Sequence, residues 1–285
     1  MRVADRFGGN RPVFSFEFFP PKTDKGFQSL YRTVEELKHL EPDYVSVTWG
    51  AGGSTRSKTV EITLQIQQEI GVTAMAHLSC VGSTPEDLAD TLGRLETGGI
   101  ENILVLGGDW PEGYTPPSGA FTYASELAEF IRSRWNFCLG GACYPETHPT
   151  APSPEVDLDN LKRKVAAGVD FLITQLFFDN RDYFDFVDRA RAAGITLPIV
   201  PGIMPVLNVR SVRRMTTLSG GRIPGELQVA LDRVEDDAGA TREVGIEWAT
   251  LQCQELLERG APGIHFYTLN KSRATQAIFQ RLLQA

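Results

Sequence analysis

Eight short apolar runs, rich in β-branched and aromatic residues, recur along the chain at a nearly regular interval. They are VFSFEFF (13–19), YVSVTW (44–49), TAMAHLSC (73–80), NILVLGGD (102–109), FCLGGACY (137–144), FLITQLFF (171–178), PIVPGIMP (198–205) and IHFYTLN (264–270). The first seven begin about 30 residues apart, and most segments between them have the apolar spacing of amphipathic helices. Several runs are apolar almost throughout, as is typical of parallel strands covered on both faces. The pattern predicts a (β/α)8 TIM barrel, with an open doubly wound sheet as the alternative.

The interval between the last two runs is the exception. Residues 206–263 have about twice the usual length, so we expect an extra helical insertion there, including SVRRMTTLSG and EVGIEWATLQCQELLERG. A chain of 285 residues suits one such barrel. We therefore expect residues 1–285 to form a single catalytic barrel without a regulatory domain.

Charge and cysteine content exclude several classes of protein. The net charge is -8, which argues against nucleic-acid binding. No apolar run approaches the roughly 20 residues of a membrane span, and the N-terminus has no signal-peptide core. The four cysteines form no CxxC pair, so we expect reduced thiols and no zinc site. These features predict a cytoplasmic protein that binds neither nucleic acid nor membrane.

Polar residues occupy the later part of most predicted strands. They are Glu17, Thr48, His77, Asp109, Tyr144 and Gln175. In a barrel these side chains converge on the C-terminal mouth, where active sites of this fold lie. No GxGxxG opens a βαβ unit, and GAGGST (50–55) lacks a P-loop lysine. HExxH and GxSxG are also absent, so neither a metal site nor serine-hydrolase chemistry is expected.

A series of motifs along the chain resembles the methylenetetrahydrofolate reductase family. In order these are FSFEFFPPKT, VSVTWGAGGSTR, AHLSC, the LGGD loop, TYASEL, YPETHP, DLDNLKRK, ITQLFFD, PGIMPV and HFYTLNKS. The resemblance runs from residue 14 to residue 272 and is that of the bacterial single-domain, FAD-dependent type. It implies a ping-pong reaction in which NADH or NADPH reduces bound FAD, and methylenetetrahydrofolate then takes the hydride to become 5-methyltetrahydrofolate, the methyl donor for methionine synthesis.

The resemblance also assigns the chemistry to particular residues. It implies that Glu17 is the general acid that protonates the bridging folate nitrogen and opens the five-membered ring to an iminium ion. The flanking Phe16, Phe18 and Phe19 favour desolvation of this carboxyl; pairing with Lys22 or another cation is the structural alternative. It further implies that Asp109 binds the pterin and sets the potential near the flavin, with Gly107 and Gly108 allowing close approach of the backbone.

Substrate and cofactor positions follow from the same resemblance. Gln175, whose amide both donates and accepts, is placed beside the folate. The flavin site comprises Thr48, His77, Gly107, Gly108, Asp109, Tyr123, Ala124, Ala142, Tyr144 and His148, together with Asp157 and Lys164 at the ribose and phosphates. Asp157 and Lys164 are seven residues apart and would share one face of a helix beginning near residue 157; without the resemblance this pattern also fits a solvated helix face.

At four positions the chain departs from the family pattern. Gly107 stands where an arginine is expected, which removes a cation from near the cofactor. Ser211 and Met215 replace a glutamine and a phenylalanine that contact substrate, and a methionine covers an aromatic face less rigidly. Lys271 replaces an arginine and keeps its charge but loses the planar fork. We assign Ser211, Met215 and Lys271 to substrate binding, with Lys271 and Arg273 facing the glutamate tail of folate.

Three alternatives follow from these departures. The first is direct hydride transfer from NADH to methylenetetrahydrofolate without flavin. The second is a non-redox, pterin-dependent methyltransferase barrel, which would need another methyl acceptor. The third is a folate-binding barrel without turnover, which would have little use for an acid such as Glu17 in an apolar strand. The sequence leaves open the choice between NADH and NADPH and whether the protein forms a homo-oligomer.

Overall fold

The parallel strands of the sheet form a barrel. The computed structural model describes residues 1–49, 56–108 and 119–283, and the following statements concern these residues. The strands are β1 (Val13–Phe18), β2 (Tyr44–Val47), β3 (Ala74–Ser79), β4 (Asn102–Leu106), β5 (Cys138–Cys143), β6 (Phe171–Thr174), β7 (Ile199–Val200), β8 (Gly202–Ile203) and β9 (Gly263–Tyr267). All pair in parallel, in the order β7-β6-β5-β4-β3-β2-β1-β9-β8.

The barrel is closed by one strand that is interrupted at Pro201. The segment before it, β7, pairs with β6, and the segment after it, β8, pairs with β9. Proline has no N–H to contribute to a ladder, so the strand changes partner at this residue. The carbonyl of Pro201 still accepts a hydrogen bond from the His265 amide at 2.9 Å. The nine short segments therefore correspond to the eight strands predicted from the sequence, and the barrel prediction is confirmed.

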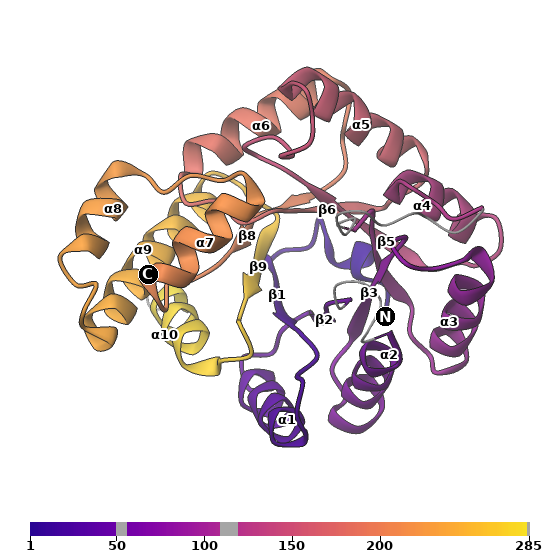
Figure 1. The fold of residues 1–285 in the computed structure, drawn as a ribbon, viewed down its shortest axis with the longest axis horizontal. Coiled ribbons are helices and arrows are strands. Elements are labelled where there is room, and N and C mark those ends of the chain that lie inside the picture. The colour runs from indigo at the N-terminus through magenta and orange to yellow at the C-terminus, as the bar shows by residue number, and fades with distance from the viewer. Residues whose placement is uncertain (50–55, 109–118, 284–285) are drawn as a thin grey trace.

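Helices surround the barrel, as Figure 1 shows. They are α1 (Asp24–Lys38), α2 (Arg56–Gln65), α3 (Pro85–Thr97), α4 (Ala124–Arg132), α5 (Pro154–Ala166), α6 (Asn180–Ala192), α7 (Val209–Ser219), α8 (Gly225–Asp232), α9 (Ala238–Glu258) and α10 (Ser272–Leu283). Local sequence fixes where several begin. The Thr84 side chain accepts from the Asp87 amide and the Asp87 carboxylate accepts from the Thr84 amide, a capping box ahead of α3.

Two apolar layers hold the barrel together. The larger lies between the strands and the helices and includes Phe16, Phe18, Leu30 and Ile278, all fully buried. The smaller fills the N-terminal end of the barrel interior, where Tyr44 and Phe171 meet a short 3-10 helix at Val3–Arg6. This N-terminal plug fills the end of the barrel opposite the mouth.

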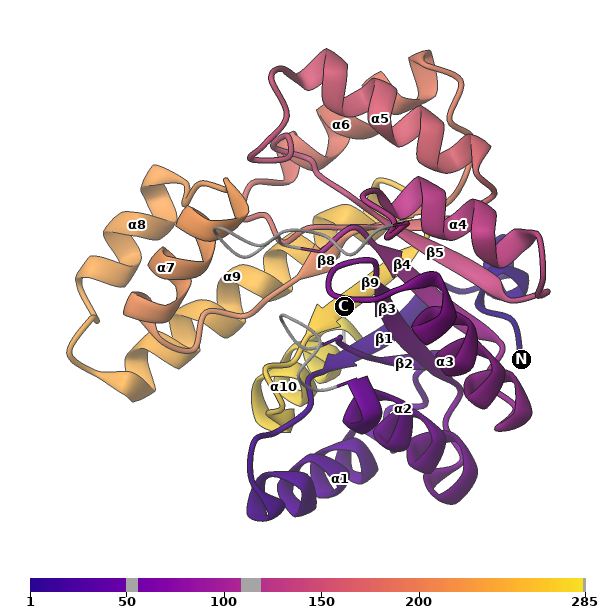
Figure 2. The ribbon, with the colours of Figure 1, turned by 45° about the vertical axis from the view of Figure 1, so that its right-hand side comes forward.

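The predicted insertion between the last two strands forms α7, α8 and α9. They lie to one side of the barrel in Figures 1 and 2 and pack around Leu227 and Leu231, both buried. Met215 of α7 is packed against this cluster and also reaches the barrel mouth. The insertion therefore supplies one wall of the mouth.

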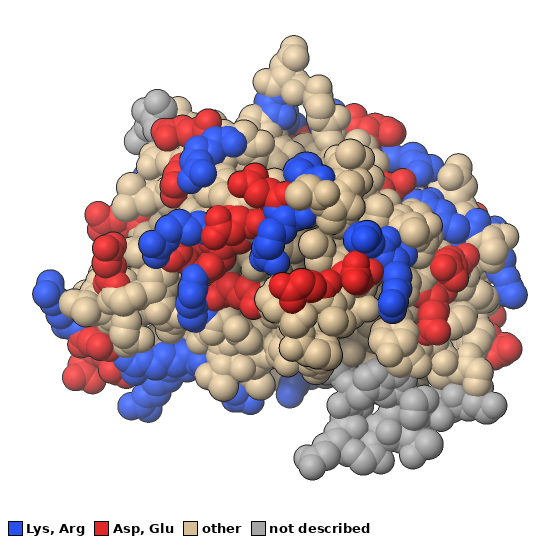
Figure 3. Space-filling model, turned by 90° about the horizontal axis from the view of Figure 1, so that it is seen from above, with Lys and Arg blue, Asp and Glu red and all other residues tan. Residues whose placement is uncertain are grey.

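The surface view in Figure 3 shows Lys and Arg interspersed with Asp and Glu across the described residues of that face. Among the residues with assigned structure, no helix is long and apolar enough to cross a membrane.

Candidate active site

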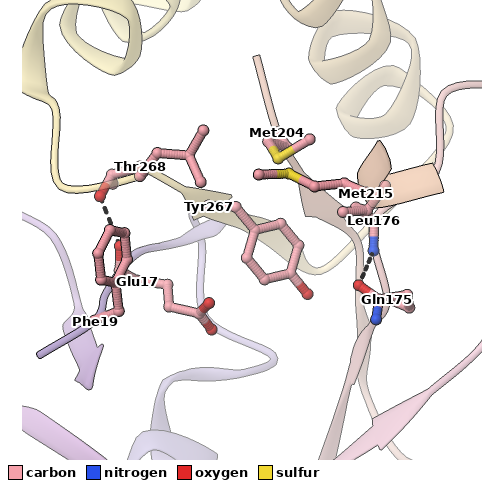
Figure 4. A pocket seen from close by; sticks show the side chains of 9 residues that line it. Glu17, Phe19, Gln175, Leu176, Met204, Met215, Tyr267 and Thr268 are labelled. Carbon is pink, nitrogen blue, oxygen red and sulfur yellow. Dashed lines mark hydrogen bonds between the residues drawn. The ribbon is translucent and has the colours of Figure 1, made fainter. Parts of the chain in front are cut away.

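The mouth of the barrel holds a cavity of about 210 Å³ next to Glu17. Its lining comes from four strand ends and from α7, and consists of Glu17, Phe19, Gln175, Leu176, Met204, Met215, Tyr267, Thr268 and Leu269. Figure 4 shows the Glu17 carboxylate and the Gln175 amide on opposite sides of the Tyr267 ring, with the two methionines along a third side. The cavity is thus apolar along its methionine side and polar at its two ends.

Glu17 makes its closest contacts with two buried histidines. Its Oε2 atom lies 3.3 Å from Nε2 of His265 and 3.4 Å from Nε2 of His77. The imidazole of His265 is fully buried, and its Nδ1 lies 2.8 Å from the Ser15 hydroxyl. A neutral imidazole can accept a hydrogen bond at its unprotonated nitrogen or donate one from its N–H group, depending on its tautomer. One oxygen of Glu17 thus lies next to two imidazole nitrogens.

The electrostatics keep His77 neutral. Burial lowers the pKa of His77 to about 4, and the Glu17 carboxylate only partly opposes this effect. At neutral pH the ring adds no positive charge that would hold Glu17 in its ionised form. Tyr267 is also neutral, because burial raises its pKa well above 10 and the nearby Glu17 charge raises it further.

The phenylalanines that flank Glu17 do not all surround its carboxyl. Side chains alternate along a strand, so Phe16 and Phe18 point away from Glu17 and pack in the layer between strands and helices. Only Phe19 lines the cavity with Glu17. The expectation that three phenylalanines desolvate this carboxyl is corrected: His77, His265 and Tyr267 are its neighbours inside the barrel, and its side chain is 16% exposed.

Hydrogen bonds between side chains and main-chain groups fix both ends of the cavity. The Thr268 hydroxyl donates to the Glu17 carbonyl at 2.6 Å, and the Tyr267 hydroxyl donates to the Thr174 carbonyl at 2.7 Å. The side-chain oxygen of Gln175 accepts from the Leu176 amide at 2.9 Å, which fixes the orientation of its amide group. These bonds tie β9 to β1 and to the end of β6, so Glu17 and Gln175 are held at fixed positions across the cavity.

The residues expected around a flavin lie at neighbouring strand ends. Thr48 follows β2, His77 is in β3, Gly107 and Gly108 follow β4, and Ala142 is in β5. Because β2 to β5 are consecutive in the sheet, these residues form one arc of the mouth beside Glu17. Asp109 lies outside the described residues. Tyr123 and Ala124 stand at the start of α4, where the Tyr123 side chain is 65% exposed.

The loop after β5 organises the remaining flavin positions. Tyr144 and His148 pack edge to face at 4.5 Å between ring centroids. The Asp157 carboxylate accepts from the His148 amide at 3.0 Å, and the Lys164 ammonium donates to the Ala142 carbonyl at 2.6 Å. Burial lowers the pKa of Lys164. The helix with these two residues begins at Pro154, with Ser153 as its cap, rather than near residue 157.

Substrate positions divide between the cavity and its rim. Gln175 and Met215 line the cavity, whereas Ser211 and Lys271 are exposed and are not part of its described lining. Ser211 lies one helical turn before Met215 in α7, and Lys271 follows the cavity residue Leu269 by two positions. Among the described residues, no group of three His, Cys, Asp or Glu side chains could hold a metal ion.

Sequence reasoning missed three residues of the site, namely Ser15, His265 and Tyr267. The signal for them was the period of two along each strand. Ser15 and Glu17 point into the barrel from β1, and His265 and Tyr267 do so from β9, with Phe16 and Phe266 facing the outer layer. Register also places Glu17 opposite Tyr267 and Ser15 opposite His265 in neighbouring strands.

Comparison with known proteins points to one family. The sequence profile of methylenetetrahydrofolate reductase matches residues 2–283. The chain is 39% identical over 268 residues to the 5,10-methylenetetrahydrofolate reductase of Escherichia coli, covering 94% of this chain and 90% of that protein. It is 38% identical over 295 residues to methylenetetrahydrofolate reductase (NADH) 1 of Zea mays, covering 99% of this chain and 50% of that protein. The chain thus spans about half the length of the maize relative.

A solved structure has the same fold. It is a Clostridium thermocellum protein described as binding two copies of 5-methyl-5,6,7,8-tetrahydrofolic acid. The superposition has a TM-score of 0.65 at 16% sequence identity and covers 98% of this chain and 95% of that one. At this identity the similarity concerns the fold alone.

Proposed function

Because the chain belongs to the methylenetetrahydrofolate reductase family, we propose that it reduces 5,10-methylenetetrahydrofolate to 5-methyltetrahydrofolate with a nicotinamide nucleotide, through bound FAD. The observation that carries the proposal is the Glu17 carboxyl at the mouth, within 3.4 Å of two buried imidazoles and in one cavity with Gln175. A carboxyl in such a setting can donate a proton to a bound substrate, and it takes up another from water before the next turnover. We accordingly propose a cytoplasmic enzyme whose product serves methionine synthesis.

Glu17 acts as the acid in the proposed mechanism. Its proton passes to the bridging nitrogen of methylenetetrahydrofolate, the bond between that nitrogen and the methylene carbon breaks, and an iminium ion forms on the folate. Nε2 of His265 lies within hydrogen-bond distance of Oε2 of the carboxyl, and the buried, neutral imidazole of His77 lies 3.4 Å from the same oxygen. Gln175 would orient the pterin from the opposite end of the cavity, while Met204 and Met215 would cover its face.

The residues around the mouth fit FAD. Small residues line the arc from β4 to β5, and among the described residues a Cβ atom at Gly107 would approach backbone atoms at 3.8 and 3.9 Å. Tyr123 offers an exposed aromatic face at the start of α4, and Lys164 supplies a half-buried cation at the end of β5. Thr48, His77, Ala142, Tyr144, His148 and Asp157 would complete the binding site. FAD, when bound, supplies the hydride carrier between the nicotinamide and the folate.

Asp109 stays a proposed pterin ligand outside the described residues. NADH is the first donor to test, because the maize and Arabidopsis thaliana relatives carry NADH in their names. Ser211, Lys271 and Arg273 at the rim would contact the distal part of folate.

The test is the visible spectrum of the purified protein during anaerobic addition of NADH and then methylenetetrahydrofolate. We expect a flavin spectrum that bleaches with NADH and recovers with the folate. A colourless protein that takes up no FAD yet oxidises NADH when the folate is present would replace the flavin route by direct hydride transfer. Absence of oxidation of both NADH and NADPH, with or without added FAD, would overturn the reductase proposal.

A further inference from the structure

Arg222 joins three loops on the mouth side of the barrel. It lies between α7 and α8, and its Nη2 atom donates to the Asp182 carboxylate of α6 at 2.5 Å. Its backbone amide donates to Oε1 of Glu146 at 2.9 Å, and its guanidinium Nε lies 3.7 Å from the same oxygen. Glu146 belongs to the loop after β5. One arginine thus contacts two carboxylates, Glu146 of the loop after β5 and Asp182 of α6, whose side chains are only 13% and 15% exposed.

The turn that carries Arg222 packs directly on the loop after β5. Helix α7 ends at Gly220, which has a φ of 74° and lies so close to Pro149 that a Cβ atom there would be 3.0 Å from its ring. A Cβ atom at Gly221 would lie 2.9 Å from Oε2 of Glu146. Two adjacent glycines therefore permit a contact that side chains would prevent. The arginine adds a charged contact to a surface that already fits closely.

The loop after β5 and helix α7, which meet at this contact, carry residues of different sides of the mouth. The loop after β5 carries Tyr144 and His148, which we assign to the flavin side. Helix α7 carries Met215, which lines the cavity on the folate side. The β5 loop is also tied to α5, through Asp157, and to α6, where Arg189 donates to the Pro145 carbonyl at 3.3 Å. Arg222 links this loop to α7.

The charges of this cluster make the contact depend on pH. The pKa of Glu146 is raised to about 7, because burial and the carboxylate of Asp182 raise it by more than Arg222 lowers it. The charged groups that face Glu146 are Asp179 and Asp182 at the start of α6 and Arg222 from the α7–α8 turn. Above neutral pH, Arg222 faces two negative carboxylates, whereas below it Glu146 is protonated and the arginine has one full ionic partner.

We propose that Arg222 is a positioning residue that fixes the loop after β5 against α7, and so sets the separation between the flavin side and the folate side of the mouth. The part of this inference that concerns ligands rests on the proposed function. The part that concerns the two loops is independent of it, because it rests on contacts within the chain.

The first experiment measures hydrogen–deuterium exchange in the ligand-free protein. Arg222→Met should speed exchange in residues 144–150 and in the turn at 219–222, because the charged contacts are lost while the apolar stem remains. The matched control is Arg213→Met, which removes an arginine of α7 that pairs with Asp232 and Glu235 within the insertion. Equal exchange in wild type and Arg222→Met, or the same increase in the control, would overturn the proposal.

The second experiment measures dissociation constants for FAD and for 5-methyltetrahydrofolate by fluorescence titration. In Arg222→Met both should rise about tenfold, in the range of ordinary coupling between sites. Arg222→Lys should recover part of the loss, and Arg213→Met should bind as wild type does. If wild type binds neither ligand, the proposed function fails, and the exchange data still decide whether Arg222 fixes the loop.

The pH dependence separates this role from a general loss of folding. Arg222 gains its second ionic partner only when Glu146 is ionised, so the exchange difference between wild type and Arg222→Met should be larger at pH 8 than at pH 6. In a Glu146→Gln background that difference should be the same at both pH values. A pH-independent difference in the chain with native Glu146 would show that the charge of Glu146 is not part of the contact.

Discussion

At the scale of single residues, the Glu17 carboxyl is the group on which the proposed reaction depends. Glu17→Gln keeps the shape of the side chain and its place between His77 and His265 but removes the acidic proton. We expect reduction of the folate to slow by about 10²- to 10⁴-fold, the usual contribution of a general acid. Oxidation of NADH with an artificial electron acceptor should be unchanged, since no folate nitrogen is protonated there. Stopped-flow measurement of the two half-reactions checks this, and equal slowing of both would contradict the assignment.

Gly107 is a second residue at which a substitution should change ligand binding. The resemblance implies an arginine at this position, and a Cβ atom there would lie 3.8 Å or more from its neighbours among residues 1–49, 56–108 and 119–283. We expect Gly107→Arg to bind FAD about tenfold more tightly through a charged hydrogen bond. Gly108→Ala is the contrasting variant, because Gly108 has a φ of 82° and a Cβ there would clash with the Ser79 hydroxyl. Titration of FAD fluorescence compares them; weaker binding by Gly107→Arg would contradict the expectation.

At the scale of elements, the N-terminal plug and the mouth are separate parts of one barrel. The Asn102 side chain accepts from the Val3 amide at 2.8 Å and donates to the Met1 carbonyl at 2.9 Å. Asn102→Ala leaves a buried amide without its partner, so we expect the free energy of unfolding to fall by about 2 kcal/mol. The Michaelis constant for the folate should not change, because the plug lies at the opposite end of the barrel.

Urea denaturation and steady-state kinetics measure these two effects. Asn136→Ala is the matched control, since Asn136 also contacts the N-terminal segment, through Arg2, but at an exposed site. It should change the free energy of unfolding by no more than about 0.5 kcal/mol. A raised Michaelis constant in Asn102→Ala would show that the two ends of the barrel are coupled.

At the scale of the whole molecule, folding places His77 where it resists protonation. Its pKa is about 4 in the folded protein, against the ordinary value of 6.5 that applies to the unfolded chain. At pH values between these two, the unfolded chain binds a proton at His77 and the folded protein does not. Stability therefore rises with pH across that window and is lost as pH falls from about 6.5 toward 4. Between pH 7 and pH 5 this group should cost about 2 kcal/mol of the free energy of unfolding.

The comparison that isolates this effect is His77→Gln, which has no charge to gain. Urea denaturation at pH 5 and pH 7 should show a smaller loss of stability on acidification than in wild type. The comparison with His77→Gln is needed because Glu146, with its pKa raised to about 7, changes the free energy of unfolding in the opposite direction over part of the same pH range. An identical pH dependence in the two proteins would mean that His77 is protonated as easily in the folded chain as in the unfolded one.

The sequence by itself determined the alternation of strands and helices, the helical insertion after the seventh strand, and the polar residues near the strand ends. These properties are local, because they follow from the period of apolar residues and from caps such as Thr84 and Ser153. The resemblance added which of those polar residues to single out, and the structure brought Glu17, His77 and Gln175 to one mouth.

Tertiary structure alone decided which side chains meet. Two imidazoles reach one oxygen of Glu17 because closure of the barrel puts β9 beside β1, while β3 lies two strands from β1 on the other side. His265 of β9 is 248 positions from Glu17 in the chain, and His77 of β3 is 60 positions from it. Phe16 and Phe18 face away because alternation assigns them to the outer layer. Arg222 meets Glu146 and Asp182 because the turn between α7 and α8 packs against the loop after β5 and the start of α6. Such contacts depend on register and closure, which no local pattern specifies.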